Sequence, residues 1–165
     1  MTDPIVIELD GPPIAWARTR VNVGPRSKQF FTPKDQRGYA TSLQWVGKEA
    51  MATRPLLSGP LSLSVVARLP IPASWTAKKK AAAVAGVVLP TSKPDYDNFA
   101  KLVGDALSCI VYCDDAQIVT ARVSKIYSDK PGLRIEVAPM REAEGKSEGP
   151  RTCLRHAGHV AEDRR

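Results

Sequence analysis

Residues 96–127 change from a helical to a strand pattern of hydrophobic side chains, and this change constrains the fold more than any other feature of the sequence. Apolar residues recur on one helical face at Phe99, Leu102, Val103, Ala106 and Leu107. Residues 117–127 instead have the pattern of a strand. Because an amphipathic helix must bury its apolar face against another element, this segment predicts a helix packed on a sheet.

The rest of the chain supplies further elements of both kinds. Strand and helix patterns alternate, in chain order, at 5–9, 33–52, 61–69 and 77–84. Lys130-Pro131-Gly132 favours a turn, so residues 133–137 are predicted to form a hairpin with the preceding strand. The order β-α-β-α-α-β-β predicts a small single-domain α/β fold with a mixed sheet and helices.

Composition sets the limits of this domain. Residues 1–140 hold all the predicted elements, with an irregular loop or hairpin at 14–30, whereas 141–165 are polar and expected to be disordered. The sequence has no run approaching the roughly 18–20 apolar residues of a membrane span. Its first residues do not have the pattern of a signal peptide. We therefore expect a soluble, cytoplasmic protein.

Charge is unevenly distributed along the chain. The formal net charge is +7, and residues 1–93 carry 13 Lys and Arg against 5 Asp and Glu. Residues 94–140 are locally acidic, with 5 basic against 7 acidic side chains. A basic body facing an acidic segment indicates a polyanionic partner, with nucleic acid as the first candidate. Solubility alone is the alternative interpretation of the same excess charge.

Two clusters of basic residues are candidates for contacts with a nucleic-acid backbone. The candidates are Arg18, Arg20, Arg26, Lys28, Lys78, Lys79 and Lys80. Such contacts position a duplex without reading its sequence. For each residue, a solvated surface charge is the competing interpretation.

Aspartates flank the amphipathic helix on both sides. Asp95 and Asp97 straddle its start, and Asp97 shares a helix face with Lys101, opposite the apolar stripe. Asp114 and Asp115 follow the helix, where a reversal of the chain can bring them back beside it. Neighbouring carboxylates repel one another unless a cation neutralises them, and Mg²⁺ prefers such oxygen ligands. A metal held in this way activates water, and a nearby lysine would steady a phosphate.

Structural roles explain the same residues without chemistry. Asp95 or Asp97 could cap the helix, because aspartate is a preferred N-cap residue. Lys101 could form a surface pair with Asp97 or Asp105, and Asp114-Asp115 could shape a turn. The residue pattern alone leaves both interpretations open.

A set of motifs resembles the RusA family of Holliday junction resolvases. The motifs are K-P-D-Y-D-N-F-A-K at 93–101, G-D-A-L at 104–107, V-Y-C-D-D-A-Q-I-V at 111–119, S-K-I-Y at 124–127 and P-G-L-R-I-E-V at 131–137. The similarity covers about residues 5–137, and Gly11-Pro-Pro13 and Phe31-Thr-Pro33 also fit it. The family occurs widely in phages and prophages, which implies a bacterial or phage-infected cell.

The resemblance implies a specific activity. Family members are small α/β homodimers that resolve four-way DNA junctions, and related branched DNA, by paired Mg²⁺-dependent nicks in recombination and repair. Mn²⁺ is expected to substitute for Mg²⁺, and no organic cofactor is expected. The family's metal ligands fall on Asp95, Asp97 and Asp115, and its catalytic lysine on Lys101. Asp114 stays open as a further ligand, and Asn98 as a residue supporting the site.

Two other functions are compatible with the sequence. In a non-catalytic DNA-binding protein that recognises branched structure, the aspartates would only cap a helix and shape a turn. A metal-dependent phosphoesterase acting on nucleotides would turn over small phosphate esters without preferring junctions. The chain has no P-loop glycine pattern and no nucleophile elbow, which disfavours two common alternatives.

Overall fold

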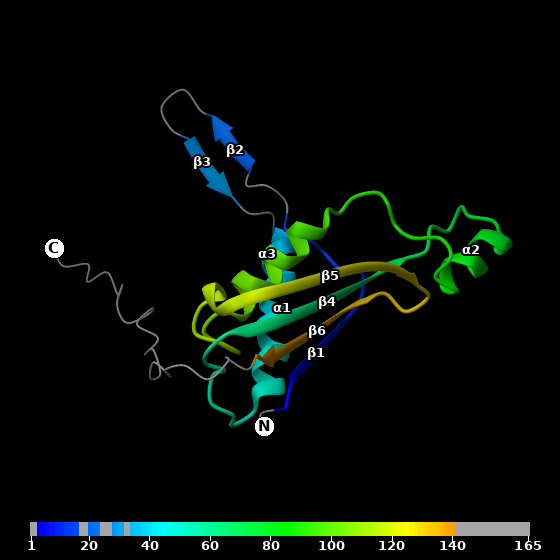
Figure 1. Cartoon of the computed structure of the whole chain (residues 1–165). Coiled ribbons are helices and arrows are strands. Elements are labelled where there is room, and N and C mark those ends of the chain that lie inside the picture. Colours follow the sequence, from blue (N-terminus) through cyan, green and yellow to red (C-terminus); the bar gives the residue numbers. More distant parts are fainter. Residues whose placement is uncertain (1–2, 17–19, 24–27, 32–33, 141–165) are drawn as a thin grey trace.

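Two helices cover one face of a four-stranded sheet (Figure 1). The computed structural model describes residues 3–16, 20–23, 28–31 and 34–140. Its main elements are β1 (Ile5–Asp10), α1 (Lys34–Met51), β4 (Leu61–Pro70), α2 (Ala77–Val84), α3 (Tyr96–Leu107), β5 (Ile118–Ser128) and β6 (Gly132–Pro139). They confirm the predicted α/β class and the order of these seven elements. Two further strands, β2 (Arg20–Val23) and β3 (Lys28–Phe31), form a separate antiparallel ribbon.

The strand order in the sheet is β1-β6-β4-β5. β6 lies between β1 and β4 and is antiparallel to both, whereas β5 lies at the edge, parallel to β4. The predicted hairpin between residues 117–127 and 133–137 is therefore wrong. After the Lys130–Gly132 turn, β6 crosses to the far side of β4, where both of its edges find hydrogen-bonding partners.

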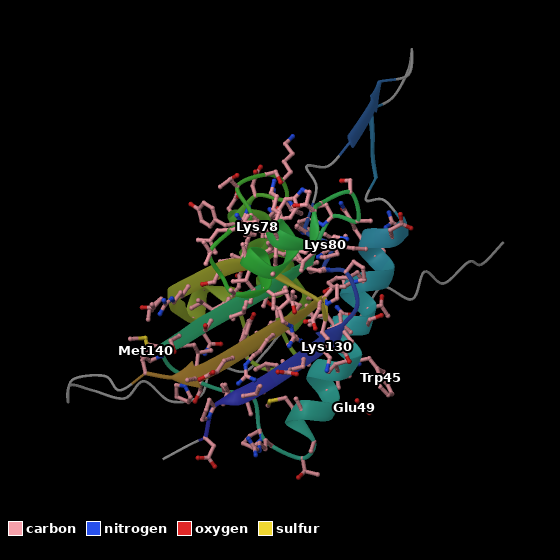
Figure 2. The ribbon with its side chains drawn as sticks, turned by 90° about the vertical axis from the view of Figure 1, so that its right-hand side faces the viewer. Trp45, Glu49, Lys78, Lys80, Lys130 and Met140 are labelled. Carbon is pink, nitrogen blue, oxygen red and sulfur yellow. The ribbon has the colours of Figure 1, made fainter. Side chains whose placement is uncertain are left out.

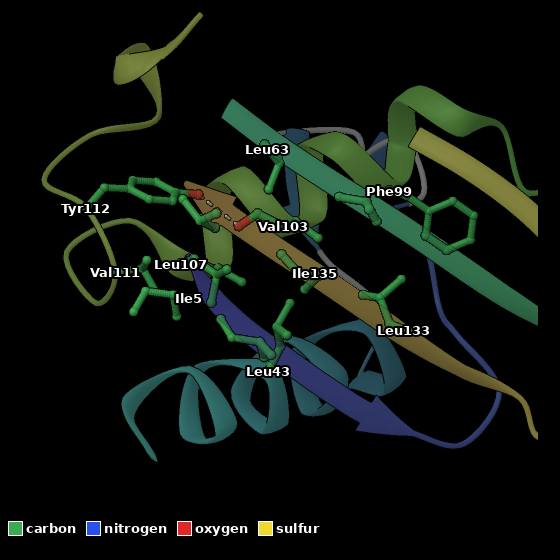
Figure 3. Close-up of a cluster of buried hydrophobic side chains, with 14 of the residues drawn as sticks. Ile5, Leu43, Leu63, Phe99, Val103, Leu107, Val111, Tyr112, Leu133 and Ile135 are labelled. Atoms are coloured by element: carbon green, nitrogen blue, oxygen red, sulfur yellow. Dashed lines mark hydrogen bonds between the residues drawn. The ribbon is translucent and has the colours of Figure 1, made fainter. Parts of the chain in front are cut away.

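The core lies between the sheet and the helices α1 and α3. β4 alternates strictly, with Leu61, Leu63, Val65, Ala67 and Leu69 buried and their neighbours partly exposed. This is the period of a strand with one face on the core. Figure 3 shows the buried side chains of β6 and α3 meeting above Leu43 of α1.

The helices α1 and α3 approach each other closely where α1 has a glycine. A Cβ placed on Gly47 would lie 2.9 Å from Cδ2 of Leu107, which is fully buried in α3. The absence of a side chain at this position therefore permits the approach. This contact lies between α1 and α3, the helix that carries most of the candidate site.

Several predictions concern residues that the structure does not describe. Arg18, Arg26 and the segment 141–165 lie outside the described residues, so the predictions made for them remain predictions. Arg20 and Lys28 are the first residues of β2 and β3. Among the described residues, no helix is both long and apolar enough to cross a bilayer.

Candidate functional site

The helix α3 presents an acidic and basic side opposite its buried stripe. Asp97 and Lys101 are exposed, whereas Phe99, Leu102 and Val103 face the core, as predicted. Positions 97, 101 and 104 follow one another at i, i+4 and i+7, so they share one side of the helix. The helix thereby presents a carboxylate and an ammonium in a row, with a glycine after them.

Asp95 stands at the N-cap position of α3 but does not cap the helix. Its backbone is extended, and its side chain makes no capping hydrogen bond. The preceding Lys93–Pro94 peptide bond is cis. The capping role that the sequence left open for Asp95 therefore finds no support here, and its exposed carboxylate is available to other groups.

The two neighbouring aspartates after α3 have different roles. Asp114 begins a single 3-10 turn, Asp115–Gln117, and its Oδ1 accepts a hydrogen bond from the Ala116 amide at 2.9 Å. Oε1 of Gln117 accepts hydrogen bonds from the amides of Cys113 (2.9 Å) and Asp114 (3.2 Å), which completes a capping box. Asp114 thus stabilises the turn, and the turn sets the backbone conformation of the next residue, Asp115.

The turn is fastened to the rest of the molecule at two points. Nε2 of Gln117 donates to the carbonyl oxygen of Gly59 at 3.2 Å, ahead of β4. The buried hydroxyl of Tyr112 donates to the carbonyl oxygen of Val103 at 3.4 Å (Figure 3). It also donates to the carbonyl oxygen of Gly104 in α3 at 3.2 Å. These bonds hold the turn against both the sheet and the helix, so the position of Asp115 is set by the fold rather than by a free loop.

Asp115 lies directly over Gly104 of α3. A Cβ placed on Gly104 would meet both Cβ and Oδ2 of Asp115 at 3.6 Å. Because Gly104 is in line with Asp97 and Lys101, the fold brings Asp115 to the same side of α3 from beyond the helix. This juxtaposition joins the two acidic motifs across one helix.

The surroundings of Asp115 disfavour its ionised form. Partial burial raises the pKa of its carboxyl group, and a hydrogen bond with Asp114 and the charges of Asp114 and Asp105 raise that pKa further. The Ala116 amide acts in the opposite direction. A carboxylate surrounded by other acids gains from a nearby cation, since the cation offsets the repulsion.

Trp16 lies along the same helix, on the side next to Lys101. Its backbone amide donates to the carbonyl oxygen of Asn98 at 3.3 Å, and its indole Nε1 donates to Oδ2 of Asp105 at 2.7 Å. Asn98 and Asp105 are two helical turns apart, so Trp16 spans the position of Lys101 between them. The N-terminal segment is thus attached to α3 just before the chain enters its basic stretch.

The donor set of the candidate site fits a hard divalent cation in chemistry. Asp95, Asp97 and Asp115 all supply exposed carboxylate oxygens, the ligand type that Mg²⁺ prefers. Within the part of the chain that the structure describes, no three Asp, Glu, His or Cys side chains gather closely enough to form a metal cluster. Asp97 and Gly104 are separated by about 10 Å along the axis of α3.

The lysines of α2 lie apart from Asp115. Figure 2 shows Lys78 and Lys80 on α2. Trp75, just ahead of this helix, packs edge-on against Tyr127 near the end of β5, with ring centroids 5.0 Å apart. Asp115 precedes the start of β5, roughly 30 Å away along the strand. The structure therefore does not bring these lysines together with Asp115.

Sequence reasoning missed the residues that hold the site in place. Trp16, Tyr112 and Gln117 contact partners that lie up to 89 positions away in the sequence. Gln117 carried a usable signal, since Asp followed three residues later by Gln is a capping-box pattern. No local pattern distinguishes Trp16 from an ordinary loop tryptophan.

Comparison with known proteins relates the chain to a protein family and to a bacterial protein. The model of the family described as "Endodeoxyribonuclease RusA" matches residues 10–138, most of the chain. A protein of Bacillus subtilis (strain 168), named "Uncharacterized protein YqaN", is 37% identical over 139 residues. That alignment covers 82% of this chain and 94% of the Bacillus protein.

Proposed function

The chain belongs to the RusA family of endodeoxyribonucleases, and from that premise we propose that it resolves four-way junctions and related branched DNA by Mg²⁺-dependent hydrolysis of phosphodiester bonds. One observation carries the proposal beyond the family name. Asp115 is seated on Gly104, on the side of α3 that also presents Asp97 and Lys101. Groups from two distant motifs thereby lie on one side of α3, with Asp97 and Gly104 about 10 Å apart along the helix axis.

In this proposal Asp95, Asp97 and Asp115 would hold the ion, and its binding would draw these carboxylates closer together than they lie in the structure. A bound Mg²⁺ supplies an activated water and stabilises the charge that develops on the phosphate. The carboxyl of Asp115 would act in its ionised form, which a cation would favour over the protonated form that its acidic neighbours promote. Asp114 is assigned to the turn, because its oxygen already accepts the Ala116 amide.

Lys101 would steady the scissile phosphate. It is exposed, and it lies on α3 between Asp97 and Gly104, the glycine that Asp115 contacts. An ammonium at this place can pair with a phosphate oxygen as a compact point charge. Preorganised charge of this kind acts on the transition state more than on substrate binding, so the loss of Lys101 should lower the cleavage rate more than the affinity.

The basic segments would hold the arms of the junction. Lys78, Lys79 and Lys80 on α2, together with Arg18, Arg20, Arg26 and Lys28, would contact phosphates, with Lys79 contributing less because its ammonium lies over the Trp75 ring. We further propose that the active form is a homodimer, since a two-fold protein would match paired cuts in opposed strands of a junction. Light scattering of the purified chain, alone and with junction, tests the dimer directly.

The central experiment compares cleavage of a synthetic four-way junction with cleavage of linear duplex, with and without Mg²⁺. The variants are Asp97→Asn and Lys101→Met, with Asp3→Asn and Lys130→Met as matched controls at exposed positions away from α3. We expect paired, metal-dependent nicks in the junction from wild type and both controls. Both site variants should bind the junction and cut it at least roughly a hundredfold more slowly.

Other results would favour another function. Junction binding without cleavage at any metal concentration would indicate a DNA-binding protein that is not an enzyme. Equal cutting of duplex would keep the nuclease and remove the preference for junctions. Turnover of small phosphate esters by the wild type, with no preference for junctions, would indicate a phosphoesterase acting on nucleotides.

A further inference from the structure

Lys125 reaches from the edge strand of the sheet to the segment in front of α3. Its Nζ donates two hydrogen bonds, to the carbonyl oxygens of Ser92 and Pro94, both at 2.9 Å. The side chain leaves β5 and is partly buried. Pro94 immediately precedes Asp95, the N-cap residue of α3. A charged group is therefore used to hold the backbone that leads into the first acidic motif.

The segment that Lys125 holds has little other polar support. Among the described residues, Lys125 is the partner in every hydrogen bond that residues 91–94 form. Asp95 itself makes no capping bond that would fix the start of the helix. Hydrogen bonds from a charged donor are about twice as strong as neutral ones, so the loss of Lys125 should loosen this segment more than the loss of a typical contact would.

We propose that Lys125 is a positioning residue for the cleavage reaction. By fixing the carbonyl groups of Ser92 and Pro94, it fixes the direction in which Asp95 and then Asp97 enter the site. This inference rests on the proposed nuclease function, and it assigns no contact between Lys125 and the reacting phosphate.

The obvious competing role for a lysine in a DNA-cutting protein is a phosphate contact. Two of the three ammonium protons of Lys125 already go to backbone carbonyls, which turns the group toward the protein. The two roles differ in what they change. A phosphate contact sets affinity and its salt dependence, whereas a positioning residue sets the rate of the bound complex.

The test uses full-length protein carrying Lys125→Met, Lys125→Arg or the control Lys130→Met, an exposed lysine in the β5–β6 turn. Three quantities are measured: the single-turnover cleavage rate at saturating protein, the junction affinity in EDTA, and amide hydrogen exchange over residues 89–98. For Lys125→Met we expect a rate loss of at least roughly tenfold, unchanged affinity and faster exchange in that segment. Lys125→Arg, which can still donate to two carbonyls, should recover most of the rate.

Each alternative result has a distinct meaning. A loss of affinity with an unchanged saturated rate would overturn the inference in favour of a phosphate contact. A slower rate with unchanged exchange over 89–98 would also overturn it. If Lys125→Met does not fold, the comparison of Lys125→Arg with Lys125→Gln decides the same question. Wild-type protein that cuts no junction would overturn the proposed function itself, whereas full activity of Lys125→Met beside an active wild type would overturn only this inference.

Discussion

The indole Nε1 of Trp16 donates a hydrogen bond to Oδ2 of Asp105 at 2.7 Å, across 89 residues of sequence. Together with the bond from the Trp16 amide to Asn98, it attaches the N-terminal segment to α3 beside Lys101. The chain enters its first basic stretch two residues after Trp16. The attachment therefore connects the acidic side of α3 with residues proposed to contact DNA.

Replacement of Trp16 by Phe should test the strength of this attachment. The variant keeps an aromatic ring but loses the donor to Asp105, and we expect the free energy of unfolding to fall by about 1 kcal/mol. Trp45→Phe is the matched control, because Trp45 is 63% exposed on α1 (Figure 2). Urea unfolding of the three proteins measures the difference. Equal losses in the two variants would show that the bond to Asp105 adds nothing to stability.

The contact between Asp115 and Gly104 predicts opposite results for two substitutions at position 104. A Cβ there lies 3.6 Å from Asp115, an ordinary van der Waals distance, so Gly104→Ala should fit. It should stabilise the protein by about 0.5–1 kcal/mol, because glycine is unfavourable inside a helix. Gly104→Leu would occupy the space of the carboxyl group and displace it.

Junction cleavage separates the two variants at position 104. We expect Gly104→Ala to retain the wild-type rate and Gly104→Leu to lose most of it while it still binds DNA. Circular dichroism and urea unfolding establish that both proteins are folded. If Gly104→Leu cut as fast as Gly104→Ala, the position of Asp115 over this glycine would be irrelevant to cleavage.

The raised pKa of Asp115 predicts how stability changes with pH. Partial burial, a hydrogen bond with Asp114 and the charges of Asp114 and Asp105 make the folded protein hold this proton more tightly than the unfolded chain does. Stability therefore falls as the pH rises from the usual aspartate pKa of about 4 through the raised value. The full penalty is present once the pH exceeds the raised value.

Asp115→Asn removes this penalty. In metal-free buffer at pH 7 the variant should be more stable than wild type, and its advantage should shrink as the pH falls and disappear below about pH 4. Denaturant unfolding at several pH values measures this, with Asp3→Asn as a control at an exposed position before β1. A difference that stays constant with pH would show that the titration of Asp115 does not differ between the folded and unfolded states.

The sequence predicted those parts of the fold that depend on local pattern. The helical spacing of Phe99, Leu102 and Val103 predicted the buried face of α3 and hence the exposure of Asp97 and Lys101. Alternation predicted β4, and residues 77–84 form α2 as expected. In each case the spacing of apolar residues, about 3.6 in a helix and 2 in a strand, determines which face is buried.

Pairing between strands could not be predicted in the same way. The alternation within β6 shows which of its residues face the core, but not that β1 and β4 are its neighbours. A short turn after β5 suggested local pairing, and the long-range pairing prevailed. Prediction of the site was limited in the same way. The spacing of residues indicated that Asp115 could return to α3. Its contact with Gly104, and the contacts of Trp16 and Lys125, depend on the tertiary fold and have no local signal.

The three consecutive lysines of α2 should not contribute equally to DNA binding. Lys78 and Lys79 are both exposed, but Nζ of Lys79 lies 3.9 Å from the centroid of the Trp75 ring, a cation–π contact, and among the described residues Lys78 has no such contact. If α2 contacts phosphates, Lys78→Gln should reduce the slope of log affinity against log salt by about 0.9. Lys79→Gln should change that slope less and instead lower the stability by about 0.5–1 kcal/mol, the strength of an exposed cation–π contact. Two measurements distinguish the residues: junction affinity over a range of salt concentrations, and urea unfolding of the same proteins. Identical salt slopes for both variants would contradict the assignment of Lys79 to Trp75.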